Sequence, residues 1–318
     1  MLDGEGGQRM ILDKSDLAIL PTLARDCRTS YASIGSQIGL TSKSVKARVK
    51  KMVRSGVIER FVVRVNPAAF GYRTALVLVK TSKGITKDDV IQRIVEFGDL
   101  AYHVYHMGST SVAALIIKKP LDKGTIQSLN ERLKPAGIIS IAVTEVTVAS
   151  SADLSETDLR IIKCLLQSGA RVEISDIAKE VGISEKTTTR RIDRMKECRL
   201  LDFSLQCSPA AMIGYIQFVI PITVAKSQYH NVLGRMYSEF QANILYSPSV
   251  IEPKDRMAFV LFGENVFAVD NVLARVNYFA GVDSADAYIL TKWQYHNDWI
   301  MKEINKRLLL HPILHKSR

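Results

Sequence analysis

Hydroxyls followed by cations between positions 41 and 54 are the residues best suited to chemistry, and that chemistry is phosphate binding. Four apolar residues recur at helical spacing and predict the buried stripe of one helix: Val45, Val49, Met52 and Val53. Five residues lie on the opposite side, at about 100° per residue: Lys43, Lys46, Ala47, Lys50 and Arg54. The predicted helix start, where backbone N–H groups bind anions, carries the hydroxyls of Thr41, Ser42 and Ser44. A lysine-rich face that begins at such an N-terminus suits the major groove of DNA.

A second stretch, at residues 184–198, repeats this pattern with changes. Its cations are Lys186, Arg190, Arg191, Arg194 and Lys196, and its early hydroxyls are Thr187, Thr188 and Thr189. Asp193 stands where the first stretch has Lys50, so this copy is electrostatically poorer or reads a different sequence. A charged face on a lone helix is most often solvated surface, but two diverged copies that both keep the cations favour DNA binding. Arg60 and Arg64, which follow the first stretch, are candidates for a basic wing.

The elements that must position these helices occur twice in the chain. The segment LDKSDLAI at 12–19 matches LSETDLRI at 154–161, a shift of 142, and IGLT at 38–41 matches VGIS at 181–184, a shift of 143. NPAAFGY at 66–72 then matches SPAAMIGY at 208–215. These ordered matches indicate a duplicated module. Gly39 and Gly182 each stand where the chain turns between two short helices, which is typical of a helix-turn-helix.

Each copy is predicted to hold three helices followed by a βαββαβ segment, so the expected fold class is α+β with two tandem units. Each unit is a winged helix-turn-helix followed by a ferredoxin-like sheet. In the first copy we expect helices at 14–26, 30–37 and 42–55, then strand 73–80, helix 87–97, strands 100–107 and 111–118, helix 123–134 and strand 138–148. In the second we expect helices at 156–166, 175–180 and 185–198, then strand 216–224, helix 228–240, strands 243–247 and 257–262, helix 265–278 and strand 282–290, with an extra basic helix at 294–309.

The expected domain limits follow from these elements and from the small-residue junction at 149–153. They are a tail at 1–11, a winged helix-turn-helix at 12–66, a sheet domain at 67–149, a linker at 150–153, a second winged helix-turn-helix at 154–208, a second sheet domain at 209–291 and a C-terminal extension at 292–318.

Composition narrows the class of protein. The formal net charge of +11 and the pI near 9.4 are compatible with a nucleic-acid partner. The four cysteines, Cys27, Cys164, Cys198 and Cys207, form no CxxC pair, so we expect neither a structural metal site nor a disulfide framework. The N-terminus does not resemble a signal peptide, and no apolar run approaches the roughly 20 residues of a membrane span. We therefore expect a cytoplasmic protein with no metal, no cofactor and no membrane partner.

The repeated segments resemble the Lrp/AsnC family of prokaryotic transcription regulators. The resemblance rests on LDKSDLAIL and SYASIGSQIGLTSKSVKARVKKMVRSGVIERFVVRVNPAAFGY in the first copy, and more weakly on the stretch from LSETDLRII to AAMIGY in the second. It covers nearly the whole chain except the first ten or so residues and the C-terminal extension. It implies double-stranded DNA as the partner and the sheet as an effector-binding and oligomerising domain, the RAM domain. A chain with two such units then resembles a covalent pseudo-dimer.

The chain departs from this family where amino-acid effectors lodge. The family's turn between the second and third sheet strands usually reads Gly-x-x-Asp, whereas here it reads Gly108-Ser109-Thr110-Ser111, and the second copy keeps Asp255 and Arg256 but no glycine. We expect these residues, with His106, to line any small-molecule site. The missing acid predicts an effector other than a plain amino acid, or a domain that serves assembly alone. The alternative is that Gly108 simply closes a hairpin.

A siroheme decarboxylase of the same architecture is the competing function. The run Tyr102-His103-Val104-Tyr105-His106 offers imidazoles near the second sheet strand. Strand alternation sends His103 and His106 to opposite faces, and the second copy has no histidine there. We therefore predict no catalytic residues and no enzyme activity.

Self-association is expected from apolar surface. The open faces of the sheets, with Val77, Val79, Val112 and Ala114 on their strands, must pair within the chain or between chains. An apolar stripe on the C-terminal helix favours a homodimer or larger, with packing on its own chain as the alternative: Trp293, Trp299, Ile300, Ile304 and Leu308.

Overall fold

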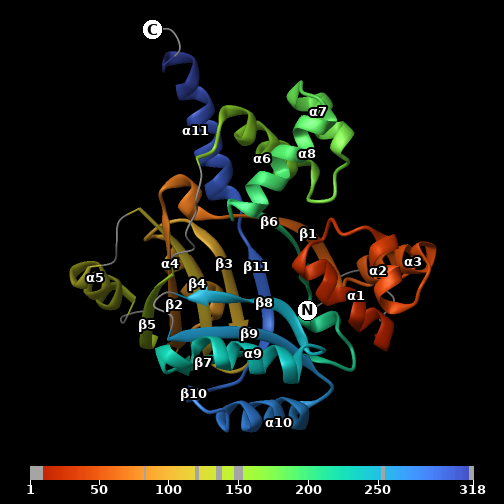
Figure 1. Ribbon diagram of the computed structural model, residues 1–318. Helices are drawn as coiled ribbons and strands as arrows, with labels where there is room; N and C mark the ends of the chain where they lie inside the picture. Colours follow the sequence, from red (N-terminus) through yellow and green to blue (C-terminus); the bar gives the residue numbers. More distant parts are fainter. Residues whose placement is uncertain are drawn as a thin grey trace. The chain divides into compact units, whose positions relative to one another are not determined.

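The computed structural model describes residues 10–81, 84–118, 122–133, 138–146, 153–251 and 255–314. The chain divides into two compact units. Figure 1 labels the helices and strands. Unit 1 comprises Met1–Arg60, Val104–Gly108 and Leu205–Trp293, and unit 2 comprises Phe61–His103, Ser109–Ser204 and Gln294–Arg318. By contacts, therefore, the first helix-turn-helix shares a unit with the second sheet domain, and the second helix-turn-helix shares one with the first sheet domain. Residues 1–9, 150–152 and 315–318 of the expected tail, linker and extension lie outside the described residues.

The first helix-turn-helix belongs to unit 1 and consists of α1 (Lys14–Arg25), α2 (Tyr31–Ile38) and α3 (Ser42–Arg54). Asp13 caps α1 in a capping box with Asp16, as the Asp13-x-x-Asp16 spacing predicts. Between α2 and α3 the chain turns at Gly39, whose φ of 71° lies in the left-handed region that favours glycine. Ile19, Ile34 and Val45 are fully buried between the three helices. The expected helices are therefore confirmed to within one or two residues.

The second helix-turn-helix belongs to unit 2 and consists of α6 (Glu156–Ser168), α7 (Ile174–Val181) and α8 (Glu185–Glu197). Ser155 caps α6 through a capping box with Asp158, and Gly182 makes the turn with a φ of 76°. Both copies thus use the same local devices to hold the two short helices that lead into the third.

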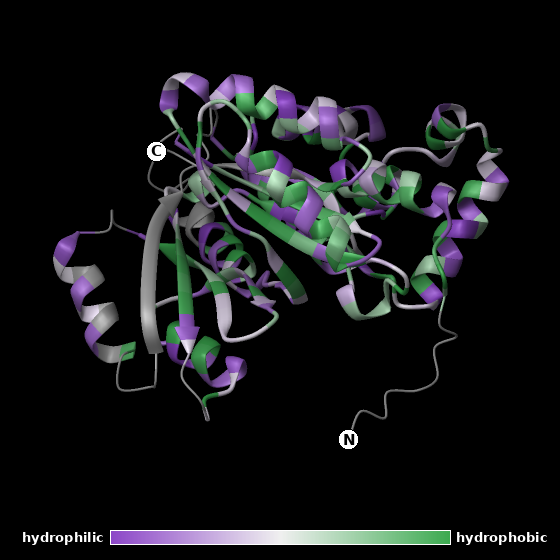
Figure 2. Cartoon of the chain, turned by 90° about the horizontal axis from the view of Figure 1, so that it is seen from below, coloured by the Kyte–Doolittle hydropathy of each residue, from purple (hydrophilic) through white to green (hydrophobic). Residues whose placement is uncertain are grey.

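The sheet domain of the first copy is built from β2 (Arg73–Thr81), α4 (Lys87–Val95), β3 (Leu100–His106), β4 (Thr110–Ile117), α5 (Lys123–Leu133) and β5 (Ile138–Val146). It belongs to unit 2 except for the last three residues of β3, which unit 1 includes. Its strand order is β5-β2-β4-β3, with β2 antiparallel to both neighbours. This is the order of a ferredoxin-like split sheet, as the βαββαβ pattern predicts. In Figure 2 the coloured strands carry long hydrophobic stretches, and the helices carry both hydrophilic and hydrophobic colour, as amphipathic helices do.

The sheet domain of the second copy is built from β7 (Ile216–Val224), α9 (Tyr229–Phe240), β8 (Ile244–Ile251), β9 (Arg256–Gly263), α10 (Val266–Asn277), β10 (Val282–Ala285) and β11 (Tyr288–Tyr295). It belongs to unit 1 except for the last two residues of β11, which unit 2 includes. Its order is β11-β7-β9-β8, the same split arrangement, and β10 also pairs with β7. Phe218 and Phe259 of the sheet pack with Met236 of α9 and Val276 of α10 in one buried cluster.

The prediction of a single strand at 282–290 is wrong, because the structure has two strands there, β10 and β11. β10 pairs with β7 up to Ile222, and β11 resumes the pairing at Val219. Pro221 lies between these two points and has no N–H to donate to a ladder, so the partner strand is interrupted there.

The expected C-terminal helix begins later than predicted, since α11 spans Asp298–Leu314 and Trp293 lies on β11. Trp299, Ile300 and Ile304 are buried, and the Trp299 ring meets the Phe70 ring edge-on at 6.1 Å within unit 2. The expectation that this stripe needs a partner chain is therefore wrong. The alternative, packing on its own chain, holds.

Both faces of the β2–β4 pair are covered. Val77 and Val79 on one face and Ala114 on the other are fully buried, and Val112 is half-buried. Pairing of whole sheet faces, within or between chains, stays a prediction.

Candidate nucleic-acid interface

The start of α3 is organised by its own hydroxyls. The Thr41 side chain accepts a hydrogen bond of 3.1 Å from the Ser44 N–H, and the Thr41 and Ser44 hydroxyls share another of 2.9 Å. This is an N-cap, which stabilises the helix by about 1 kcal/mol. Thr41 and Ser42 are exposed and Ser44 is half-buried. Of the three hydroxyls, Ser42 is the one that the cap does not engage.

The outward face of α3 is strongly cationic. Its exposed charged residues are five cations and no acid: Lys43, Lys46, Lys50, Lys51 and Arg54. Ala47 is exposed among them. Within the described ranges, no carboxylate forms an ion pair with the ammonium groups of Lys43, Lys46 or Lys50. The predicted cationic face is therefore present and accessible.

The buried stripe of α3 is shorter than predicted. Val45, Val49 and Met52 are buried, but Val53 is 43% exposed. The spacing of four residues from Val49 to Val53 carries the helix past the edge of its contact with α1 and α2, so Val53 stands beside the cations instead of in the core.

One cation of α3 is turned away from this face. The Arg48 Nη1 donates to Asp13 Oδ2 at 2.7 Å and to Asp16 Oδ1 at 2.9 Å, and so joins α3 to the start of α1. Burial acts to raise the pKa of the Asp13 carboxyl, but the hydrogen bond from the Asp16 N–H and the Arg48 guanidinium lower it below its ordinary value. Sequence reasoning missed this clamp. The signal was there, since Arg48 matches Arg191 at the shift of 143.

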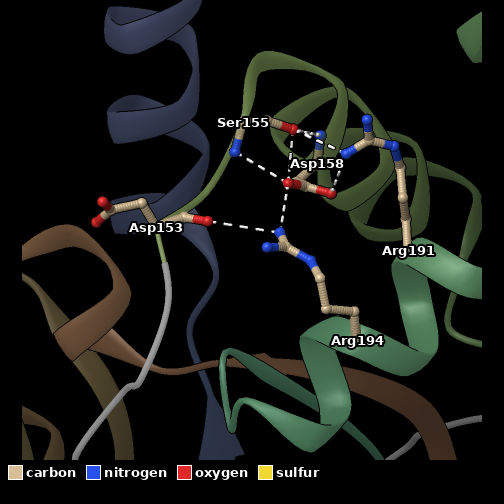
Figure 3. A network of polar contacts seen from close by, with 5 residues as sticks. All are labelled: Asp153, Ser155, Asp158, Arg191 and Arg194. Atoms are coloured by element: carbon tan, nitrogen blue, oxygen red, sulfur yellow. Dashed lines mark hydrogen bonds and ion pairs between the residues drawn. The ribbon is translucent and has the colours of Figure 1, made fainter.

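The second copy holds two arginines in a corresponding clamp (Figure 3). The fully buried Asp158 carboxylate accepts from Arg191 Nη1 at 3.1 Å and from Arg194 Nη2 at 2.8 Å. It also accepts from the Ser155 N–H at 2.9 Å and the Ser155 hydroxyl at 2.6 Å. Arg194, expected at the DNA interface, is therefore directed toward α6.

The rest of the α8 surface mixes both signs of charge. Lys186, Thr189 and Arg190 are exposed as expected, while Thr187 is half-buried and shares a hydrogen bond of 2.9 Å with the Ser184 cap. A groove beside α8 is lined by four cations, Lys186, Arg190, Arg191 and Arg194, and by four acids, Asp153, Asp158, Asp193 and Glu197. Positive charge in this groove is matched by negative charge, unlike the face of α3.

The two arginines of the expected wing lie on β1 (Ile58–Val65), which pairs with β6 (Leu201–Cys207). In unit 1, Arg60 donates to Gln206 Oε1 through Nε at 3.3 Å and Nη2 at 3.2 Å. In unit 2, Arg64 forms a bidentate ion pair with Asp202, at 2.6 and 3.0 Å. Burial acts to lower the pKa of Arg64, but Asp202 raises it above its ordinary value. An unpaired basic wing is thus not what the structure shows, because β6 supplies partners for both guanidinium groups.

The candidate effector residues are distributed over both units. In unit 1, His106 is buried with its ring 5.2 Å from that of Tyr288, and Gly108 adopts a φ of 79° in the turn after β3. Asp255 and Arg256 are also in unit 1, with 4.0 Å between Asp255 Oδ1 and Arg256 Nε. The Asp255 carbonyl accepts a hydrogen bond from the Val224 N–H.

The remaining effector candidates lie in unit 2. The Ser109 carbonyl accepts from both the N–H and the hydroxyl of Thr81, and Thr110 is half-buried. Ser111 is fully buried, and its hydroxyl has no hydrogen-bond partner among the described residues. An effector role for either set stays a prediction.

The two histidines of β3 have different neighbours, as strand alternation predicts. In unit 2, His103 Nδ1 lies 2.9 Å from His296 Nε2, whereas in unit 1 His106 contacts Tyr288. Among the described residues, no group of three or more His, Cys, Asp or Glu side chains could hold a metal ion. No described helix is both long enough and apolar enough to cross a membrane.

Comparison with known proteins identifies both helix-turn-helix segments. The AsnC-type helix-turn-helix domain matches residues 12–53 and again 154–196. An uncharacterised HTH-type transcriptional regulator of Pyrococcus horikoshii is 27% identical over 144 residues, which is 45% of this chain and 89% of that protein. The HTH-type transcriptional regulator LysM of Sulfurisphaera tokodaii is 27% identical over 123 residues, 38% of this chain and 82% of that protein. Less than half of this chain therefore matches most of the length of each relative, as expected for a chain that contains two copies of one module.

A solved structure of similar length is the siroheme decarboxylase NirDL, which matches 92% of this chain and 99% of its own. The sequence identity is 14% and the TM-score 0.49, so this likeness carries no argument about activity.

Proposed function

We propose that this chain is a tandem transcription regulator of the Lrp/AsnC type and that it binds double-stranded DNA by placing α3 in the major groove. The matches of both helix-turn-helix segments to the AsnC-type domain, and the HTH-type transcriptional regulators among its relatives, support the proposal. The Lys side chains of α3 then neutralise backbone phosphates, and residues at its centre meet base edges. Lys46 and Ala47 occupy that centre, where an ammonium can bond guanine and a methyl group can contact thymine.

A single observation carries the proposal: α3 exposes five cations and no acid on a helix that follows a tight, glycine-dependent turn. The five cations on this face repel one another, and an anion that lies against the face offsets this repulsion. The phosphate backbone of DNA supplies such anions at close spacing, and releases counterions when they are neutralised.

The test is the double substitution of Lys43 and Lys46 by Ala, with DNA affinity measured by fluorescence anisotropy at several salt concentrations. Each phosphate contact contributes about 0.9 to the slope of log K against log salt, so the slope flattens by about 0.9 if Lys43 alone contacts a phosphate and by about 1.8 if Lys46 contacts one too. The control replaces two exposed lysines away from α3, Lys123 of α5 and Lys226 before α9, and removes the same charge. An unchanged slope in the α3 variant, or an equal change in the control, would refute the proposal.

Sequence reading is tested by Lys46→Ala alone, across a pool of DNA sequences. If Lys46 bonds a base edge, its loss costs about 1–3 kcal/mol for preferred sequences and less for the others. A uniform loss across the pool would assign Lys46 to phosphate and leave base reading to the neighbouring residues of α3.

The sheet domains are proposed to assemble the protein as a homodimer or larger and to hold any small-molecule effector. Effector binding at His106, Gly108 or Ser111 would raise the melting temperature in a ligand screen, because a ligand that binds only the folded state stabilises it. The proposal includes no catalytic step. It places the protein in the cytoplasm, where a prokaryotic transcription regulator meets its DNA. A large stabilisation by siroheme in that screen would favour the decarboxylase alternative.

A further inference from the structure

The two recognition helices can be compared position by position, because α8 follows α3 at a constant shift of 143 residues. Three positions change from neutral or basic to acidic. Glu185 stands for Ser42, Asp193 for Lys50 and Glu197 for Arg54, and all three acids are exposed. The acids therefore lie at the start, the middle and the end of the helix.

The cations that α8 retains are largely committed to the protein itself. Arg191 and Arg194 both donate to the buried Asp158 carboxylate, and Arg194 also reaches the Asp153 carbonyl at 3.5 Å (Figure 3). In α3, by contrast, Arg48 alone makes the corresponding contact, and position 51 keeps an exposed lysine.

The exposed charges of the two helices are opposite in balance. The exposed residues of α3 carry five cations and no acid, whereas those of α8 carry two cations, Lys186 and Arg190, and three acids. A helix in the major groove lies between two rows of phosphates, so each exposed acid is repelled while each cation is attracted. Among the exposed residues of α8, the acids that are repelled outnumber the cations that are attracted.

We infer that each chain carries one DNA-reading head, the first helix-turn-helix, and that α8 stays out of the major groove. A two-fold symmetric operator is then bound by two chains, one α3 on each half-site, and not by the two heads of one chain. The second copy keeps its fold because its clamp and cap hold it, and the same clamp directs the guanidinium groups of Arg191 and Arg194 to Asp158. This inference rests on the proposed function of α3.

A matched set of variants of the full chain tests it, with duplex DNA and the same salt titration. Lys186→Ala with Arg190→Ala removes the two exposed cations of α8, and we expect affinity within twofold of the parent and an unchanged salt slope. Asp193→Lys with Glu197→Arg restores the α3 pattern, and we expect tighter binding with a slope steeper by up to about 1.8. Circular dichroism of each variant is the check that the variant is folded.

The outcomes separate the inference from the proposed function. If the Lys186 and Arg190 variant weakens binding tenfold or flattens the slope, α8 binds DNA and the inference is wrong. That result would also favour the alternative in which Asp193 accepts a hydrogen bond from cytosine and α8 reads its own sequence. A folded Asp193 and Glu197 variant with no gain would likewise overturn the inference, because the acids would not be what keeps α8 from DNA. If the Lys43 and Lys46 variant is also without effect, DNA binding itself is wrong.

Stoichiometry gives an independent readout. Sedimentation of the chain with a duplex that holds two half-sites should give two chains per duplex, and with a duplex that holds one half-site it should give one duplex per chain, whether or not the chains are dimers. A single chain that protects both half-sites from cleavage would overturn the inference.

Discussion

We expect the second helix-turn-helix to lose much of its stability when the negative charge of Asp158 is removed. Asp158→Asn keeps the size of the side chain but takes away the negative charge that holds Arg191 and Arg194, at 3.1 and 2.8 Å. The carboxylate is fully buried, while the two arginine side chains are 28% and 41% exposed and keep part of their hydration. Loss of a fully buried pair costs about 3–5 kcal/mol, and a hydrogen bond to a charged group contributes about 1.5–3 kcal/mol. With solvent screening on the arginine side, we expect a loss of about 2–3 kcal/mol.

Hydrogen exchange of the α6 and α8 amides measures this loss locally, which matters because a chain with two units does not unfold in one step. Each 1.4 kcal/mol is a factor of ten, so exchange through opening of this helix-turn-helix should be about 30- to 140-fold faster. The same change at Asp16 of the first copy removes one guanidinium contact instead of two, and the expected loss there is smaller, about 1–2 kcal/mol.

The control is Asp193→Asn, the same chemical change at an exposed position of α8. Its carboxylate has no ion pair within the part of the chain that the structure describes, so exchange should stay as in the parent. Equal exchange rates for the Asp158 and Asp193 variants would show that the clamp does not stabilise the second helix-turn-helix.

Two further predictions follow from shifted pKa values. Burial and the hydrogen bond to Glu303, at 2.7 Å, raise the pKa of Tyr72 to about 12, so the stability this residue contributes is fully present below about pH 10 and is lost as the pH rises toward 12. Tyr72→Phe should lower the free energy of unfolding by about 1–2 kcal/mol at neutral pH and remove that alkaline loss, and an identical alkaline melting profile in parent and variant would contradict this. Burial also raises the pKa of Cys207 to about 12 and that of Cys164 to about 11, so mass spectrometry after brief alkylation should find the half-buried Cys198 modified first. Faster labelling of Cys207 in the native protein would be inconsistent with its burial.

The elements of the fold could be predicted because their signals are local. Capping pairs such as Ser155 with Asp158, turn glycines and apolar spacing act within one or two helical turns, and the structure has them where the sequence places them. The split of the last strand could not be predicted from its own residues. Its cause is Pro221, which lies in β7, far back in the chain.

The candidate site was predictable only in part, for the same physical reason. The exposed lysines of α3 follow from helical periodicity, but the partners of the arginines do not. Arg64 is 138 residues from Asp202, and Arg194 is 36 residues from Asp158, so nothing in the local sequence shows that these guanidinium groups are neutralised. Comparison of the two copies could have found the clamp, because Arg48 and Arg191 are matched while the neighbouring positions are not.

The residues that the two copies share maintain the fold of the module, whereas the residues that would contact DNA differ between the copies. Both keep the cap acid, the clamp arginine and the turn glycine, and these residues act on the interior of the three-helix unit whatever lies outside it. The outward positions are free of that constraint, since an exposed charge changes the stability of a helix by only a few tenths of a kcal/mol. Exchange of Lys50 and Arg54 for Asp193 and Glu197 therefore costs the second copy almost nothing in folding, yet it reverses the sign of the surface that would meet the phosphates. A duplicated head can in this way lose its DNA contact while its fold persists, which is why the helix-turn-helix pattern alone does not assign a function to the second copy.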